Sequence, residues 1–144
     1  MAFILAFGWL TEVRADHYSG ATISYTCLGG NFYTVNLDVY LNCAGVPIGP
    51  QTLHFQNQCG VFFSQPNVAL TLTEEVSPLC PSQLNSSTCN GGLNPGFRRY
   101  RFATTVYLSP CNWWTMSWNI CCRNLTENLQ NTPGIYAEAT LNNF

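Results

Sequence analysis

The chain has 144 residues, of which 8% are charged and 14% are aromatic, and its formal net charge is -2. This length suits one domain with a hydrophobic core, and so few charges with so many aromatic residues exclude an intrinsically disordered chain. Seven carboxylates and five arginines, with no lysine, create no long-range positive field, so the composition argues against a protein that binds nucleic acid or a charged membrane surface.

The first fifteen residues have two interpretations. An apolar run from Ala2 to Leu10 is followed by Val13-Arg14-Ala15, which fits the small-residue pattern of a signal-peptidase site. No basic residue precedes the run, so the alternative is a first β-strand that stays in the mature protein. We expect residues 1–15 to be a signal peptide or an N-terminal strand, and residues 16–144 to form a single domain. The run is too short to span a membrane as a helix.

From Ala21 onward, apolar and polar residues alternate with the period of two that is typical of half-buried β-strands. The alternating runs are 21–27, 33–41, 68–72, 100–108 and 135–141. Between the first two runs, Gly29-Gly30-Asn31 supplies residues that tolerate a positive φ, which predicts a hairpin. Residues 81–85 are expected to form a single helical turn.

The segment from Cys111 to Cys122 also alternates. One face would carry Trp114, Met116, Trp118 and Ile120, and the other Trp113, Thr115, Ser117 and Asn119. The first set is predicted to face the core. Short strands separated by turns must bury their apolar faces against one another. We therefore expect an all-β fold, an antiparallel β-sandwich of about seven or eight strands, Ig-like or jelly-roll-like, that is stapled by disulfides.

The eight cysteines indicate an oxidising, extracytoplasmic compartment. They are Cys27, Cys43, Cys59, Cys80, Cys89, Cys111, Cys121 and Cys122. No C-x-x-C motif occurs and the two histidines lie far apart, so neither a metal site nor a catalytic thiol is expected. The pairs that we expect are Cys43 with Cys59, Cys80 with Cys89, and Cys27 with Cys121 or Cys122.

Three side chains are candidates for ligand binding. Trp113 shares its predicted face with small polar residues, so it is either a platform for a sugar ring or a protein partner, or an aromatic packed under a loop. Arg99 and Arg101 would project from one outer face, where they could clamp a carboxylate or a phosphate, or simply form a solvated surface. No catalytic motif or cofactor-binding motif is present.

Several segments resemble, in order, the N-terminal region of the very large surface proteins of Bacteroidetes that carry PKD-type repeats and a gliding-motility-associated C-terminal domain. The matching segments are His17-Tyr-Ser-Gly, Ile23-Ser-Tyr, Cys27-Leu-Gly-Gly-Asn31, Val39-Tyr40 with Cys43, Leu79-Cys-Pro-Ser, Ser87-Thr-Cys-Asn-Gly-Gly92, Trp118-Asn-Ile-Cys-Cys-Arg-Asn124, and Gly134-Ile-Tyr-Ala-Glu-Ala-Thr-Leu-Asn-Asn143. The resemblance spans residues 16–144. It implies export, display on the cell exterior and an adhesin-like role. No C-terminal sorting domain of that family is matched here.

We therefore expect a secreted, non-enzymatic surface module with an adhesive or fibre-forming role and no cofactor. Its partners would be other surface proteins, copies of itself, or glycans, with neither nucleic acid nor a membrane span involved. One alternative is a carbohydrate-binding module that uses Trp113 and nearby tyrosines. A second is a secreted glycan hydrolase whose acid and base come from Glu74, Glu75, Glu138 or Asp38.

Overall fold

The computed structural model describes residues 18–45, 47–121 and 134–144, which form seven strands and two short 3-10 helices. The elements are β1 (Tyr18–Gly29), β2 (Phe32–Asn42), β3 (Gln51–Asn57), β4 (Phe62–Glu75), η1 (Pro81–Ser86), η2 (Thr88–Asn90), β5 (Phe97–Tyr107), β6 (Trp114–Ile120) and β7 (Ile135–Leu141). Among these residues, no helix is long and apolar enough to cross a membrane. The predicted signal peptide or strand at residues 1–15 lies outside the described residues.

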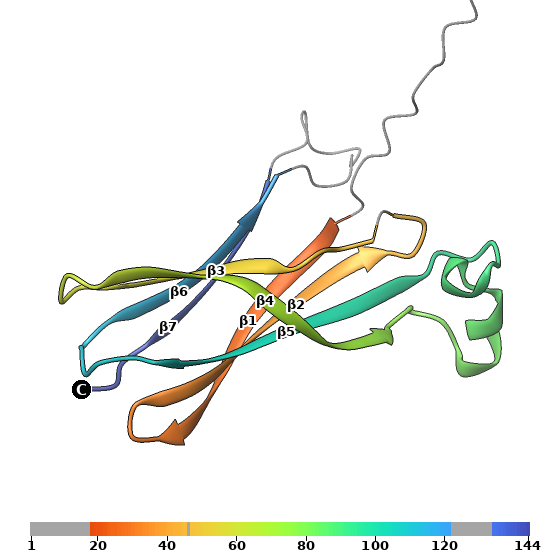
Figure 1. The fold of residues 1–144 in the computed structure, drawn as a ribbon. Coiled ribbons are helices and arrows are strands. Elements are labelled where there is room, and N and C mark those ends of the chain that lie inside the picture. Colours follow the sequence, from red (N-terminus) through yellow and green to blue (C-terminus); the bar gives the residue numbers. More distant parts are fainter. Residues whose placement is uncertain (1–17, 46, 122–133) are drawn as a thin grey trace, which may run out of the picture.

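The strands form one sheet in the order β1-β2-β5-β4-β3-β6-β7, and every neighbouring pair is antiparallel. The sheet curls so that β7 comes beside β1 (Figure 1), where the Tyr25 hydroxyl donates a hydrogen bond of 3.0 Å to the Thr140 carbonyl. The prediction of an antiparallel all-β fold is confirmed. The structure has a nearly closed, barrel-like sheet in place of the predicted Ig-like or jelly-roll-like sandwich.

Strand β4 explains why the sheet is continuous. Its first half pairs with β3, from Phe62 to Val68, and its second half pairs with β5, from Ala69 to Glu75. Between these halves Asn67 has a φ of 54°, and both pairings shift register near this point. Irregularities of this kind bend a strand and increase its twist. One long strand therefore joins what would otherwise be two separate sheets.

The β1–β2 hairpin is confirmed. The two strands pair antiparallel, and the connecting residues Gly29, Gly30 and Asn31 have φ values of 93°, 58° and 64°. Glycine and asparagine adopt this left-handed region at low cost. The helical turn predicted at residues 81–85 is also confirmed, since η1 covers it.

The core fills the inside of the curled sheet with alternate residues of the strands. Its largest buried side chains are Trp114, Trp118, Phe55, Phe102, Leu37, Leu53, Leu108 and Met116. Trp114, Met116 and Trp118 are buried as predicted, and Ile120 packs against the core at its edge. The buried Trp118 indole donates a hydrogen bond of 2.9 Å to the Gln51 side-chain oxygen, so a polar residue can be accommodated in the core.

Two disulfides tie loops to loops rather than strand to strand. Cys43, after β2, bonds to Cys89 in η2, and Cys59, between β3 and β4, bonds to Cys111, between β5 and β6. The expected Cys43–Cys59 and Cys80–Cys89 pairs are therefore wrong. These pairs would close short loops, whereas the fold brings together cysteines that are 46 and 52 residues apart.

The other cysteines also differ from expectation. Cys27 and Cys80 are exposed free thiols, which contradicts the predicted bonds of Cys27 to Cys121 or Cys122 and of Cys80 to Cys89. Cys121 is disulfide-bonded. Cys122 lies outside the described residues. Bonded cysteines in the described region indicate an oxidising, extracytoplasmic environment.

Candidate functional site

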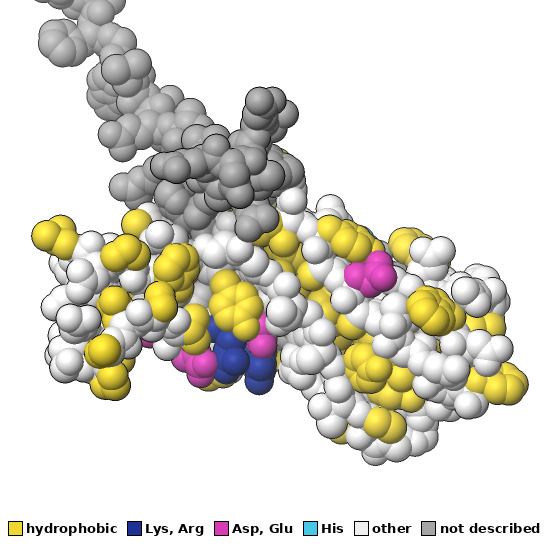
Figure 2. All heavy atoms as spheres, turned by 180° about the vertical axis from the view of Figure 1, so that it is seen from behind, with side chains coloured by type: hydrophobic (Ala, Val, Ile, Leu, Met, Phe, Trp, Pro, Cys, Tyr) yellow, Lys and Arg dark blue, Asp and Glu magenta, His cyan; other side chains and the backbone are white. Residues whose placement is uncertain are grey.

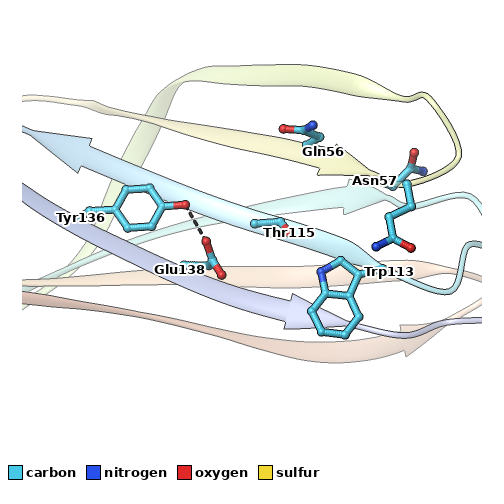
Figure 3. Close-up of a pocket in the computed structure, with 7 residues that line it drawn as sticks. Gln56, Asn57, Trp113, Thr115, Tyr136 and Glu138 are labelled. Carbon is cyan, nitrogen blue, oxygen red and sulfur yellow. Dashed lines mark hydrogen bonds between the residues drawn. The ribbon is translucent and has the colours of Figure 1, made fainter.

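A shallow groove of about 390 Å³ opens on the outer face of the sheet over β3, β6 and β7. It is lined by Gln56, Asn57, Gln58, Trp113, Thr115, Tyr136 and Glu138. Figure 3 shows Tyr136 at one end and Trp113 at the other, with Thr115 between them. The three strands are brought together by the pairing of β3 with β6 and of β6 with β7, and outward-facing residues therefore line a single surface.

The Trp113 end is held by covalent and hydrogen bonds. The Cys59–Cys111 disulfide joins the loop before β4 to the loop before β6, and the Gln58 amide donates a hydrogen bond of 3.2 Å to the Trp113 carbonyl. The next residue, Trp114, is almost fully buried, and alternation turns Trp113 outward. Trp113 is 48% exposed. Of the two interpretations of this residue, exposure on the surface is the one that the structure supports.

The other end is formed by Tyr136 and Glu138, which project from the same face of β7. The Tyr136 hydroxyl donates a hydrogen bond of 2.6 Å to Glu138 Oε2, and 62% of the tyrosine is exposed. This hydrogen bond to the carboxylate, together with partial desolvation, raises the pKa of the Tyr136 phenol above its usual value. The bond also restricts the orientation of the ring. An aromatic face is thus presented to solvent in a defined position.

Polar side chains from β3 and β6 lie between the two rings. Gln56 pairs with Thr115 across the β3–β6 ladder, and both offer hydrogen-bonding atoms to the groove. Asn57, 6% exposed, accepts hydrogen bonds from the amides of Cys59 and Val61 at 3.0 and 2.8 Å through its Oδ1. Its Nδ2 is buried and has no hydrogen-bond partner among the described residues. Asn57 shares the buried side of β3 with Leu53 and Phe55, so its side chain closes the β3–β4 turn at the end of the groove and presents no accessible donor to it.

Of the residues that the structure describes, Glu138 is the only charged one that lines the groove. One of its oxygens already accepts the Tyr136 hydroxyl, and no described arginine or histidine lines the groove. The groove therefore has aromatic ends, an uncharged polar floor and a single carboxylate. Hydrogen bonding and stacking, rather than charge neutralisation, are the interactions that it can offer.

Arg99 and Arg101 do not contribute to this groove. Arg101 makes two hydrogen bonds of 2.7 Å to the carboxylate of Asp38, its neighbour across the β2–β5 ladder. These bonds raise the pKa of the Arg101 guanidinium. Arg99 forms an ion pair of 2.6 Å with Glu74 on β4. Both guanidinium groups are therefore paired within the chain. Figure 2 shows basic and acidic side chains in one small cluster on an otherwise mostly uncharged face.

The carboxylates considered for a hydrolase are also dispersed. Asp38 and Glu74 are bound to arginines, and Glu75 accepts hydrogen bonds from Ser77 and Asn90 at 2.6 and 2.9 Å. Of the four candidates, Glu138 alone lines the groove. Within the described ranges, no group of three or more His, Cys, Asp or Glu side chains could hold a metal ion.

Sequence reasoning identified Trp113 but missed Gln56 and most of the groove. The alternation of residues 135–141 predicts that Tyr136 and Glu138 share one side of their strand. It does not show which strand lies beside them, so the groove could not be assembled from this pattern. The whole of β3 was missed. Comparison with protein-family models, with curated proteins and with solved structures finds no match to this chain.

Proposed function

We propose that this protein is a non-enzymatic extracellular surface module that adheres to a partner through the groove over β3, β6 and β7. The observation that carries the proposal is the pair of exposed aromatic side chains, Trp113 and Tyr136, at the two ends of a polar floor. Exposed aromatic residues in a prepared pocket are typical anchors of binding surfaces.

Four features support an extracellular adhesive module over a hydrolase or a purely structural fibre. The disulfides favour an oxidising compartment, and the resemblance to large exported surface proteins favours display outside the cell. Hydrolysis of a glycosidic bond usually requires two carboxyl groups on opposite sides of the bond, whereas Glu138 is the one carboxylate that the described residues bring to the groove. A groove with anchors at both ends favours recognition of a partner over a purely structural role in a fibre.

The proposal is tested by retention of the oxidised protein on a panel of immobilised extracellular polymers that includes both polysaccharides and proteins. We expect retention on at least one surface, and loss of that retention in Trp113→Ala and Tyr136→Ala. The matched control is Tyr107→Ala, because Tyr107 is 52% exposed and lies on β5 outside the groove. Retention that is equal in all four proteins, or no retention on any surface, would overturn the proposal.

A further inference from the structure

We infer that the ligand of the groove is an uncharged oligosaccharide chain that lies along β6 and β7 and contacts both Trp113 and Tyr136. The inference rests on the proposed function and assigns a ligand class to the same groove. Four properties of the groove select this class: its aromatic ends, its hydrogen-bonding floor, its charge and its length.

The aromatic ends suit sugar rings. A pyranose ring has one face of C–H groups that packs on an aromatic face, while its hydroxyls point outward from the ring edge and require hydrogen-bond partners. Trp113 and Tyr136 offer exposed aromatic faces, with 48% and 62% of each residue accessible. Extended peptides would instead seek an open strand edge, but the groove lies on the face of paired strands, where backbone groups are already bonded.

The floor suits hydroxyl groups because its side chains both donate and accept. Gln56 and Gln58 offer amides, Thr115 a hydroxyl, and Glu138 an acceptor oxygen beyond the one that binds Tyr136. An apolar ligand would leave these groups unpaired.

The charge of the groove selects among glycans. Glu138 is the one ionised group among the described residues of the lining, and the described arginines are held by hydrogen bonds or ion pairs elsewhere. A uronic acid or a sulfated sugar would bring a second negative charge close to this carboxylate, and none of the described residues that line the groove carries a positive charge to offset it. Neutral chains avoid this repulsion.

The length of the groove selects a chain over a single sugar. Tyr136 pairs with Asn119, which lies six residues along the chain from Trp113, so the two aromatic Cα atoms are on the order of 20 Å apart at ~3.3 Å per residue. Figure 3 shows the two rings at opposite ends of the lining residues. One monosaccharide cannot contact both rings, whereas several linked sugars can.

The test is calorimetric titration of the oxidised full chain with neutral gluco-, xylo- and manno-oligosaccharides, from monosaccharide to hexasaccharide, and with oligogalacturonates of matched length. We expect at least one neutral series to bind with an affinity that rises with length. Trp113→Ala and Tyr136→Ala should each lower hexasaccharide affinity about tenfold or more, and Tyr107→Ala should not. Glu138→Gln should raise affinity for oligogalacturonate relative to the neutral hexamer. Near-UV circular dichroism verifies that each variant is folded.

Two results would overturn the inference. One is tighter binding of oligogalacturonate than of every neutral series by the wild type. The other is absence of neutral glycan binding while groove-dependent retention on an immobilised protein persists, which would refute the ligand class and leave the adhesive function standing. Absence of both glycan binding and groove-dependent retention would refute the function as well.

Discussion

The buried ion pair between Asp38 and Arg101 allows a sharp test of the structure. The two residues face each other across β2 and β5, with both hydrogen bonds at 2.7 Å, and the side chain of Asp38 is only 9% exposed. Arg101→Met removes the guanidinium but retains most of the aliphatic stem. The carboxylate would then be left buried and without its cation.

The expected cost follows from burial. Removing one partner of a fully buried ion pair costs about 3–5 kcal/mol. Because 32% of the Arg101 side chain is exposed, water can reach the site and reduce this penalty, so we expect a loss of about 2–3 kcal/mol. The double variant Asp38→Val/Arg101→Met removes both charges and should lie within about 1 kcal/mol of the wild type.

Urea unfolding of the oxidised proteins, followed by tryptophan fluorescence, measures these differences in free energy. The reasoning would be refuted if Arg101→Met lost less than about 0.5 kcal/mol, which is the range of ordinary surface changes. It would also be refuted if the double variant were less stable than the single variant, because relief of the unpaired charge is the predicted effect.

Three further predictions concern the loops. Cys59→Ala/Cys111→Ala should lower the free energy of unfolding by about 4 kcal/mol, because the bond closes a loop of 52 residues in the unfolded chain, and urea titration measures the loss. The pKa of the Glu75 carboxyl is lowered, above all because the Ser77 hydroxyl donates a hydrogen bond to it. The ionised carboxylate therefore stabilises the folded protein fully above the pKa of Glu75 in the unfolded chain, about 4.3. This stabilisation is lost as the pH falls through the pKa of Glu75 in the folded protein. Glu75→Gln should therefore weaken the pH dependence of the melting temperature in the acid range. Gly92→Ala should cost about 1–3 kcal/mol, measured by thermal unfolding, because a Cβ there would overlap the backbone of Ser86.

Each of these has a matched control and an outcome that contradicts it. Unchanged stability of the double cysteine variant would count against the Cys59–Cys111 bond, and Cys27→Ala, which removes a free thiol, serves as its control. An acid transition of Glu75→Gln identical to that of the wild type would show that the Ser77 contact has no energetic effect. Gly49→Ala is the control for Gly92, since a Cβ at Gly49 meets no atom within 4 Å; equal effects of the two would contradict the predicted overlap.

The local features of the fold could be predicted from the sequence because they depend on neighbouring residues. Alternation separated the buried Trp114 and Trp118 from the exposed Trp113, and Gly29-Gly30-Asn31 identified the first hairpin. Strand β3 was missed since Leu53 and Phe55 are its only inward apolar residues. The other two inward positions of β3 are the polar residues Gln51 and Asn57. Gln51 can be buried because it accepts a hydrogen bond from the Trp118 indole, and the local sequence pattern does not reveal this contact between distant residues.

The candidate site and the disulfides depend on contacts between distant segments, so the sequence could not assemble them. Gln56 reaches the groove because β3 pairs with β6, and Tyr136 because β7 follows on the other side. Likewise, Cys59 bonds to Cys111 because the closing sheet brings their loops together. Eight cysteines allow 105 pairings, and short loop length was a poor criterion for choosing among them.

The claim that the outer face of β3, β6 and β7 is the binding surface is tested most directly by nuclear magnetic resonance. Isotope-labelled, oxidised protein would be titrated with the neutral hexasaccharides, and the perturbed signals would be mapped onto the sheet. We expect the largest shifts at the Trp113 indole and at the amides of Thr115, Tyr136 and Glu138, with those of β1, β2 and β5 unchanged. Shifts centred on the face that carries Arg99, or no shifts with any of these glycans, would contradict the account.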